Sequence, residues 1–386
     1  MNVLHLLSWF PTPDDPYSGN FCLKHIRAVS EHVHSVVLSA YPDEKVSRHF
    51  EVEVADYPNF KYVVVRVRPA RNRWVRKIRL FLAYQHGLEF VEKNFFHPDL
   101  VHQHVTLPVG RIALFWKKTR HIPYVLTEHW TIYQPQNSAM MTPRVRKRIG
   151  KIANNAEKIL PVSYDLQCNM QKYGIHAPFQ VVPNVVDVSL FLPGQGSGDG
   201  KKHILHISTL RDEAKNVSGI FRVLKRLSEK RCDFVLDVVH DYRRPDLECY
   251  VKDNGMEEMV RFHGRKTEKE IAAFYARAHF FLLFSNFENL PCVLIESFAC
   301  GLPVVTTDVG GIREIVDDSR GRVLRAGDED KLLETLDFML DHYTDFDAVA
   351  IRKYAEEHFS MEVIGHQIAA VYHDVFSNKI HQELKI

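Results

Sequence analysis

The sequence has few cysteines, and none of them is spaced for a zinc ribbon or a redox pair. Its 386 residues include six cysteines, none within a CxxC sequence and most inside apolar runs. We therefore expect reduced, buried thiols rather than disulfides or a metal centre, in a cytosolic compartment.

Long hydrophobic runs are also missing. No apolar segment approaches the ~20 residues that a membrane-spanning helix requires. The first residues, MNVLHLLSWFPTP, lack the basic leader and the cleavage site of a secretory signal. The sequence predicts a strand over Met1 to Leu7 and a cytoplasmic protein, whose only membrane association would be peripheral, on the inner face.

Acidic residues are scarce in the first half of the chain. Residues 1–192 carry 24 Lys and Arg against 15 Asp and Glu, whereas residues 193–386 carry 26 against 33. Two segments hold no acid at all, Lys61 to Leu80 and Thr142 to Ile152. They are candidate contact surfaces for something anionic.

The partner of these basic segments stays open at this point. Trp74, Ile78, Leu80, Phe81 and Leu82 lie among the charges and favour an anionic membrane surface. Nucleic acid is disfavoured, because no recognised nucleic-acid motif accompanies the charge. The alternative is a solvated helix face whose arginines pair with acids of another domain.

Short β-branched runs alternate with segments of helical period along the whole chain, which predicts an α/β fold with parallel, helix-covered sheets. The stretch GQGSGDGKK, Gly194 to Lys202, predicts a linker between two doubly wound domains, 1–192 and 193–362. It precedes a strand instead of following one, so it does not match a dinucleotide fingerprint. A terminal helix or helix pair follows over Tyr354 to Phe376.

The most informative passage runs from Phe280 to Val316. It predicts a buried strand over Phe280 to Phe284, a polar loop, and a helix from Pro291 to Gly301. Ligands of open α/β sheets bind at the carboxyl ends of strands, where this loop lies. Two carboxylates frame it, Glu288 and Glu296, and Glu296 suits ribose hydroxyls unless it caps a neighbouring backbone group.

These residues resemble a known family. The passage SNFENLPCVLIESFACGLPVVTTDVGG is similar to the signature of the retaining GT-B glycosyltransferases of family 4. Ordered matches follow along almost the whole chain: WFPTPDDPYSGNF, DLVHQH, TEHW and VVPNVVD.

The resemblance implies an architecture and a reaction. The fold would be GT-B, two Rossmann-like domains facing across a cleft, with a C-terminal helix at about 363–386 crossing back to the first domain. The reaction would move a sugar from a nucleotide diphosphate sugar to an acceptor hydroxyl, with retention of configuration. A glycan or lipid-linked precursor of envelope polysaccharide is the expected acceptor, and no metal or cofactor is expected.

The resemblance also implies roles for residues of the second domain. Glu288 would contact the transferred sugar and Glu296 the ribose, with the backbone of Asn289 and Leu290 facing the sugar or phosphates. Asn289 stands where the family commonly has glycine. In RFHGRK, Gly264 and Arg265 would lie beside the base, although a strand-end turn explains them equally well.

The diphosphate clamp departs from the family pattern. In HISTLRDEAKNVSGI, Lys215 matches the family's lysine, but Thr209 occupies the usual place of the arginine. We expect Arg211 to supply the second cation, because a guanidinium binds a diphosphate bidentately. The alternative is a solvated helix start.

Three residues of the first domain complete the expected site. Gly19 and Asn20 resemble the loop that approaches the diphosphate, and His129 matches the histidine near the reacting carbon, where it could donate a hydrogen bond or manage a proton. His102 and His104 share one strand face, but no nearby Asp or Cys completes a metal-binding set.

Two other functions stay open on the sequence. An epimerase of nucleotide sugars would need an additional acid and base. A degenerate binding subunit would keep donor affinity without turnover, and the Thr209 departure favours it.

Overall fold

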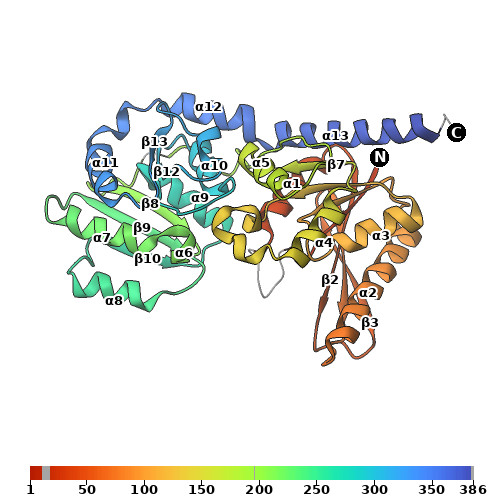
Figure 1. Cartoon of the computed structure of the whole chain (residues 1–386). Helices are drawn as coiled ribbons and strands as arrows, with labels where there is room; N and C mark the ends of the chain where they lie inside the picture. Colours follow the sequence, from red (N-terminus) through yellow and green to blue (C-terminus); the bar gives the residue numbers. More distant parts are fainter. Residues whose placement is uncertain (11–17, 195, 384–386) are drawn as a thin grey trace. The chain divides into compact units, whose positions relative to one another are not determined.

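The computed structural model of the chain describes residues 1–10, 18–194 and 196–383 (Figure 1). Two compact units make up the chain: Met1–Pro183 together with Met361–Ile386, and Asn184–Ser360. The C-terminal segment of the chain thus belongs to the same unit as the N-terminus.

The N-terminal unit is built on a seven-stranded sheet in the order β3-β4-β2-β1-β5-β6-β7. Only β3 and β4 pair antiparallel; the other neighbours are parallel. Parallel strands covered on both faces read as nearly continuous apolar runs, and Val3, Leu4 and Leu6 of β1 are fully buried. The strands are β1 (Asn2–Leu6), β2 (His34–Pro42), β3 (Phe50–Tyr57), β4 (Phe60–Val67), β5 (Leu100–His104), β6 (Tyr124–Glu128) and β7 (Lys158–Pro161).

Among the described residues of this unit, six α-helices lie around the sheet. α13 packs along α1 (Figure 1), and a Cβ at Gly365 of α13 would lie 2.4 Å from the carbonyl oxygen of Ala28 in α1. The periodicity of the tail does not indicate which domain it covers. In the structure α13 belongs to the N-terminal unit, where Ile364 and Ile368 are buried. The helices are α1 (Asn20–Val29), α2 (Arg73–Asn94), α3 (Gly110–Arg120), α4 (Pro143–Ala153), α5 (Tyr164–Lys172) and α13 (Met361–Glu383).

The C-terminal unit contains a six-stranded, all-parallel sheet in the order β10-β9-β8-β11-β12-β13. Its core gathers apolar side chains from the sheet and from α7 and α11, such as Phe221 and Leu336. The strands are β8 (Lys202–Ser208), β9 (Phe234–His240), β10 (Val260–Gly264), β11 (Phe280–Leu283), β12 (Val304–Thr307) and β13 (Gly321–Leu324).

The helices of this unit include the one expected between Pro291 and Gly301. α10 has Pro291 as its N-cap, and Gly301 beyond its end adopts a φ of +72°. The helices are α6 (Asp212–Lys215), α7 (Val217–Ser228), α8 (Pro245–Asp253), α9 (Glu268–Arg277), α10 (Cys292–Ala299), α11 (Glu329–His342) and α12 (Ala348–Phe359).

The two units divide at Pro183 and Asn184, earlier than the expected 192. The Asn184 side chain donates to the Leu290 carbonyl, and Val186 pairs with Ser360, so this segment is tied to the C-terminal unit. The glycine-rich stretch lies within that unit as well. A Cβ at Gly194 would lie 1.7 Å from the Ala276 carbonyl oxygen, so this glycine is packed instead of free.

One expectation about side chains needs correction. The six cysteines are free, as expected, but Cys168, Cys232 and Cys249 are exposed, because Cys168 and Cys249 lie on the outer faces of α5 and α8 and Cys232 lies in a loop. Arg66 of β4 pairs with Asp43, Glu51 and Glu53 of its own unit. Among the described helices, none is long and apolar enough to cross a membrane.

Arg352 joins three segments of the C-terminal unit and offers a stability test. Its guanidinium donates to the carbonyls of Val188, Phe191 and Ala299 at 3.0, 2.9 and 2.5 Å. We expect Arg352→Leu to lower the free energy of unfolding by about 2 kcal/mol, because three carbonyls lose a charged donor. Urea unfolding measures the loss.

The control is Lys353→Leu, because Lys353 is 68% exposed and its ion pair with Glu357 spans 3.7 Å. That variant should change stability by less than ~0.5 kcal/mol. Equal effects of the two substitutions would contradict the role assigned to Arg352.

Candidate functional site

The carboxyl edge of the C-terminal sheet carries the residues that the sequence singled out there. The loop after β8 leads through Arg211 to Lys215, the end of β10 holds Gly264, and the loop after β11 holds Glu288. Because all six strands are parallel, these loops emerge at one edge. The fold therefore brings together groups that lie far apart in the sequence.

Lys215 and Glu288 form a largely buried ion pair. The Lys215 ammonium contacts Glu288 Oε1, and the two side chains are 18% and 10% exposed. Ser285 Oγ donates to the same carboxylate oxygen at 2.7 Å. A buried charge is costly without a partner, so each of these groups holds the other in place.

The loop that carries Glu288 is fixed on two sides. The Asn286 amide N–H donates to the Ala214 carbonyl at 2.7 Å, which joins the loop to α6. Thr307 Oγ1 donates to the Ser285 carbonyl at 2.6 Å from β12. Gly310, with a φ of +57°, lies so close that a Cβ would be 2.2 Å from the Glu288 carbonyl oxygen. Only glycine fits there, and the loop geometry depends on it.

Glu296 lies inside α10, buried to 8% exposure. Its Oε2 is 3.2 Å from the Tyr275 hydroxyl, which also lies 2.8 Å from the Val293 carbonyl. The sequence did not indicate Tyr275 as a partner of Glu296, because a tyrosine on the apolar face of a helix looks like an ordinary core residue. The Tyr275 hydroxyl is therefore a side-chain neighbour of the Glu296 carboxylate.

Asn289 and Leu290 are held through their backbones. The Asn289 carbonyl accepts from the Gly311 N–H at 2.8 Å, and the Leu290 carbonyl accepts from Asn184. Asn289 does not adopt a positive φ, so an asparagine in the place of the family's glycine needs no strained backbone.

Arg211 is the exposed N-cap residue of the short helix α6. Within the described part of the chain, no ion pair engages its guanidinium. Arg244, which the sequence analysis did not single out, closes the preceding turn by donating to the Leu210 carbonyl at 2.6 Å. The loop after β8 thus presents two cations, of which Lys215 is paired and Arg211 is available to a ligand.

Gly264 and Arg265 line a cavity of about 340 Å³ at the same edge of the sheet. His240, Asp241, Arg243, Glu248 and Phe262 complete its wall. Gly264 has a φ of +61°, which lets the chain turn sharply where β10 ends.

In the N-terminal unit, side chains from the first turns of α1 lie beside the His129 ring. Gly19 has a φ of +67°, and a Cβ there would lie 2.1 Å from the Trp9 carbonyl oxygen, so the position requires glycine. Asn20 begins α1, and the ring of Phe21 lies 4.5 Å from that of His129. Residues 11–17 of the WFPTPDDPYSGNF motif lie outside the described residues.

Glu128 is a buried carboxylate that the sequence analysis passed over within TEHW. Its oxygens accept from the backbone N–H groups of Thr106, His129 and Trp130 at 2.9 to 3.1 Å and from Thr106 Oγ1 at 2.5 Å. Burial raises the pKa of this carboxyl, although these bonds oppose the shift. Glu128 positions the backbone at His129. The only signal for this role in the sequence is that an acidic residue directly precedes that histidine.

More side chains that could bind a metal lie near His102 and His104 than the sequence predicted. His5 joins them within ligand distance, and Cys22 and His129 form a second group with His104. No Asp or Cys was expected beside this pair, but Cys22 lies beside His104, and a third histidine, His5, completes a possible ligand set. Both nitrogens of His102 have hydrogen-bond partners, the Tyr372 hydroxyl at 2.5 Å and Thr127 Oγ1 at 2.7 Å, which favours a neutral network over metal binding. The expectation that no metal is required remains a prediction.

Comparison with known proteins defines the family and the fold of this chain. The family of glycosyl transferases group 1 matches residues 191–358, and Glycosyltransferase Family 4 matches residues 19–190. Among solved structures, a sucrose-phosphate synthase from Thermosynechococcus elongatus superposes with a TM-score of 0.76 at 14% identity, covering 98% of this chain and 100% of the other. Anabaena HepE in complex with UDP-glucose gives 0.73 at 17% identity, covering 97% and 100%.

The curated relatives are distant but consistent. TuaC of Bacillus subtilis (strain 168), a glycosyltransferase named for teichuronic acid biosynthesis, is 24% identical over 70% of this chain and 68% of its own. An MMP alpha-(1->4)-mannosyltransferase of Mycolicibacterium hassiacum is 26% identical over 71% and 70%. The chain belongs to the group 1, family 4 glycosyltransferases; it is a transferase with the GT-B fold.

The histidines in the N-terminal unit predict a loss of stability in acid. Burial lowers the pKa of His5 to about 3 and of His25 to about 4, and lowers those of His102 and His104 well below the usual value. Between pH 6.5 and about 4 the unfolded chain therefore binds more protons, so the free energy of unfolding should fall as the pH drops. We expect at least ~1 kcal/mol per pH unit, measured by urea unfolding.

His25→Gln keeps a donor for the Pro183 carbonyl, which His25 Nε2 contacts at 2.9 Å, and removes one titrating group. Its slope between pH 6.5 and 5 should be smaller than that of the wild type. The exposed His176→Gln serves as the control substitution. A pH-independent stability over this range would contradict the prediction.

Proposed function

We propose that this glycosyltransferase takes its sugar from a nucleotide diphosphate sugar and transfers it, with retention of configuration, to an acceptor hydroxyl. The observation that carries the proposal is the Lys215–Glu288 pair at the carboxyl edge of the C-terminal sheet. It offers a cation for a diphosphate and a carboxylate for sugar hydroxyls in one place. Anabaena HepE, which shares the fold, was solved in complex with UDP-glucose, and this supports a donor of the same class.

The donor contacts follow from the placement of the side chains. Lys215 and Arg211 neutralise the diphosphate, and the backbone of Asn289 and Leu290 faces the sugar or phosphates. Glu296, with the Tyr275 hydroxyl 3.2 Å away, accepts from the ribose hydroxyls. The base enters the cavity beside Gly264 and Arg265.

The same proposal includes roles for three residues of the N-terminal unit, Gly19, Asn20 and His129. Gly19 and Asn20 approach the diphosphate through their backbones, which the glycine at 19 allows. His129, whose backbone Glu128 fixes, hydrogen-bonds the sugar near the reacting carbon.

The chemical step needs little from the side chains. As the bond between the anomeric carbon and the leaving phosphate breaks, the two cations stabilise the developing diphosphate. The leaving phosphate accepts the proton of the acceptor hydroxyl, whose oxygen bonds to the same face of the sugar. Glu288, held by Lys215 and Ser285, positions the sugar and does not attack it. No metal or cofactor takes part.

The proposed acceptor is a glycan or lipid-linked precursor of envelope polysaccharide, reached at the inner face of a membrane. Two observations support it: the basic first half of the chain, and the similarity to TuaC, which is named for teichuronic acid biosynthesis. An anionic surface would attract the basic unit and raise the local concentration of a lipid-linked acceptor.

Nucleotide binding is the first experiment. We expect one of UDP, GDP, ADP or TDP, or its sugar, to raise the melting temperature selectively, since ligand at ~100 times its dissociation constant adds roughly 2.7 kcal/mol. Glu296→Ala should lose the shift, because the ribose loses its acceptor. No shift with any nucleotide would sink the donor proposal.

Turnover tests the two cations and the carboxylate. Glu288→Ala should abolish transfer, and Arg211→Ala should lower it about 100-fold, in the range seen when one electrostatic stabiliser is removed. Arg211 is exposed and unpaired among the described residues, so its variant should keep the wild-type melting temperature. Lys252→Ala, an exposed cation of α8, is the control. Unchanged turnover of Arg211→Ala, or loss of activity with EDTA, would contradict the mechanism.

A further inference from the structure

The N-terminal half of α2 lies outside the core of its unit. Every residue from Arg73 to Ile78 is exposed, and the buried residues of the helix begin at Ala83. Trp74, Ile78 and Leu82 are 66%, 58% and 46% exposed. Large apolar side chains rarely stand in water in such a row without a binding role.

These three side chains form one stripe. They recur every fourth residue and therefore lie on the same face of the helix, opposite the face that Gly87 and Val91 bury against the sheet. The helix thus has two apolar faces, of which the core uses one. Lys77 and Arg79 flank the exposed stripe on either side, as basic residues do at a membrane interface.

This half of the helix is ordered without help from the core. The Asn72 side chain caps it by accepting from the N–H groups of Trp74 and Val75 at 2.8 and 3.3 Å. The Arg79 guanidinium donates to the carbonyls of Arg68 and Pro69, both at 3.0 Å, and fixes the helix to the end of β4. The stripe is therefore presented on a preformed helix.

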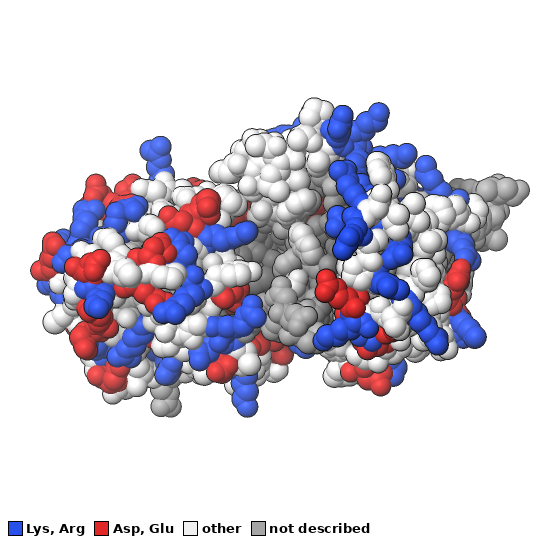
Figure 2. Space-filling view, turned by 90° about the horizontal axis from the view of Figure 1, so that it is seen from below, with Lys and Arg blue, Asp and Glu red and all other residues white. Residues whose placement is uncertain are grey.

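The surrounding charge is positive and uncompensated. Among the described residues, no carboxylate pairs with Arg73, Arg76 or Lys77. Arg73, together with desolvation and with Arg148, Arg111 and Arg76, lowers the pKa of Lys77, so cations of α3 and α4 add to the same field. Figure 2 shows Lys and Arg side chains gathered along the upper part of the N-terminal unit, whereas both signs mix on the C-terminal unit. The field favours an anionic partner.

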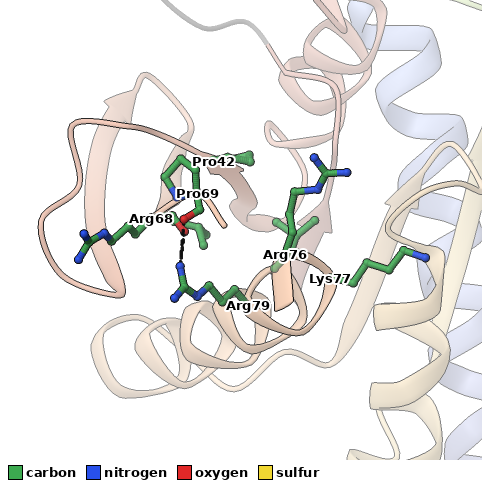
Figure 3. A pocket seen from close by; sticks show the side chains of 8 residues that line it. Pro42, Arg68, Pro69, Arg76, Lys77 and Arg79 are labelled. Atoms are coloured by element: carbon green, nitrogen blue, oxygen red, sulfur yellow. Dashed lines mark hydrogen bonds between the residues drawn. The ribbon is translucent and has the colours of Figure 1, made fainter. Parts of the chain in front are cut away.

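A cavity of about 270 Å³ lies on a different side of α2, between the helix and the ends of β2 and β4, and none of the stripe residues lines it. Pro42, Val67, Pro69 and Leu80 give it apolar walls. In Figure 3 the charged ends of Arg68 and Lys77 point away from it to opposite sides, and Arg79 reaches back to the chain beside Pro69. The cavity is therefore separate from the exposed stripe.

We propose that the N-terminal half of α2 docks onto an anionic phospholipid surface. Trp74, Ile78 and Leu82 enter the interface between headgroups and acyl chains, and Arg73 and Lys77, which lie 5.9 and 5.0 Å from the centre of the Trp74 ring, bind the lipid phosphates. The exposed apolar stripe favours lipid over nucleic acid, which would need cations but no such stripe. The proposal deepens the proposed function, because a lipid-linked acceptor would lie in that surface, but its physical argument needs only α2.

Vesicle binding tests the surface. The wild-type chain should co-sediment with vesicles of phosphatidylcholine and phosphatidylglycerol in about equal amounts, should not do so with phosphatidylcholine alone, and should be released by ~0.5 M salt. The double variant Arg73→Gln, Lys77→Gln should bind about 10- to 30-fold more weakly, because each cation near an anionic surface adds about 1 kcal/mol. Lys252→Gln with Lys269→Gln removes the same charge from the C-terminal unit and should stay within about twofold.

The apolar stripe has its own readout. Brominated phosphatidylglycerol vesicles should quench tryptophan fluorescence, and Trp74→Phe should remove most of that quenching while still binding. Ile78→Ser should weaken binding, whereas Val349→Ser, an exposed valine of α12, should not.

Several outcomes would overturn the proposal: equal binding to neutral vesicles, equal loss in the control double variant, quenching that survives in Trp74→Phe, or binding of duplex RNA with none of vesicles. Nucleotide-induced stabilisation of the same variants separates the two proposals. Vesicle binding without any nucleotide shift would refute the donor assignment alone, and the converse would refute the docking surface alone.

Discussion

The ion pair of Lys215 and Glu288 is the interaction on which the candidate site depends. It joins the loop after β8 to the loop after β11 through two charges that could not stay buried alone. The Asn286 hydrogen bond to the Ala214 carbonyl fixes the same two loops through their backbones. The cation and the carboxylate therefore hold their positions before any ligand arrives, and a ligand that meets both does not have to order them.

Behind the pair, the packing leaves almost no freedom. Gly310 approaches the Glu288 carbonyl so closely that any side chain would displace the loop, and Thr307 holds Ser285 from β12. A glycine and a threonine that touch no expected ligand thus determine where a carboxylate points. The position of Glu288 is a property of three adjacent parallel strands, β8, β11 and β12, rather than of its own loop.

Much of this could be predicted from the sequence, and the reasons for the exceptions are physical. Parallel strands buried on both faces leave continuous apolar runs, so β1, β5, β8 and β11 were evident. The hairpin of β3 and β4 was missed because its strands carry charges, among them Glu51, Glu53 and Arg66, that pair across the sheet. The linker was misplaced because glycine suggests freedom, while Gly194 is in fact packed against a carbonyl.

Polar partners inside the core were the hardest to predict. Glu296 stands out in an apolar helix, but its neighbour Tyr275 looks like any core aromatic of α9 until the fold brings the two within 3.2 Å. Glu128 was equally hard to predict, because its oxygens accept from backbone N–H groups of Thr106 and Trp130 that only the fold brings close.

Apolar residues lie on two faces of α2, and the fold accounts for only one of them. A helix that only covers a sheet needs one apolar face, and Gly87, Leu88 and Val91 already provide it. A second face of Trp74, Ile78 and Leu82 adds nothing to the stability of the folded chain, because it stays in water. Its exposure raises the tendency to aggregate, and the flanking cations oppose self-association while favouring an anionic surface. Nothing in the fold requires either the apolar stripe or the cations beside it. An anionic, amphiphilic partner accounts for both.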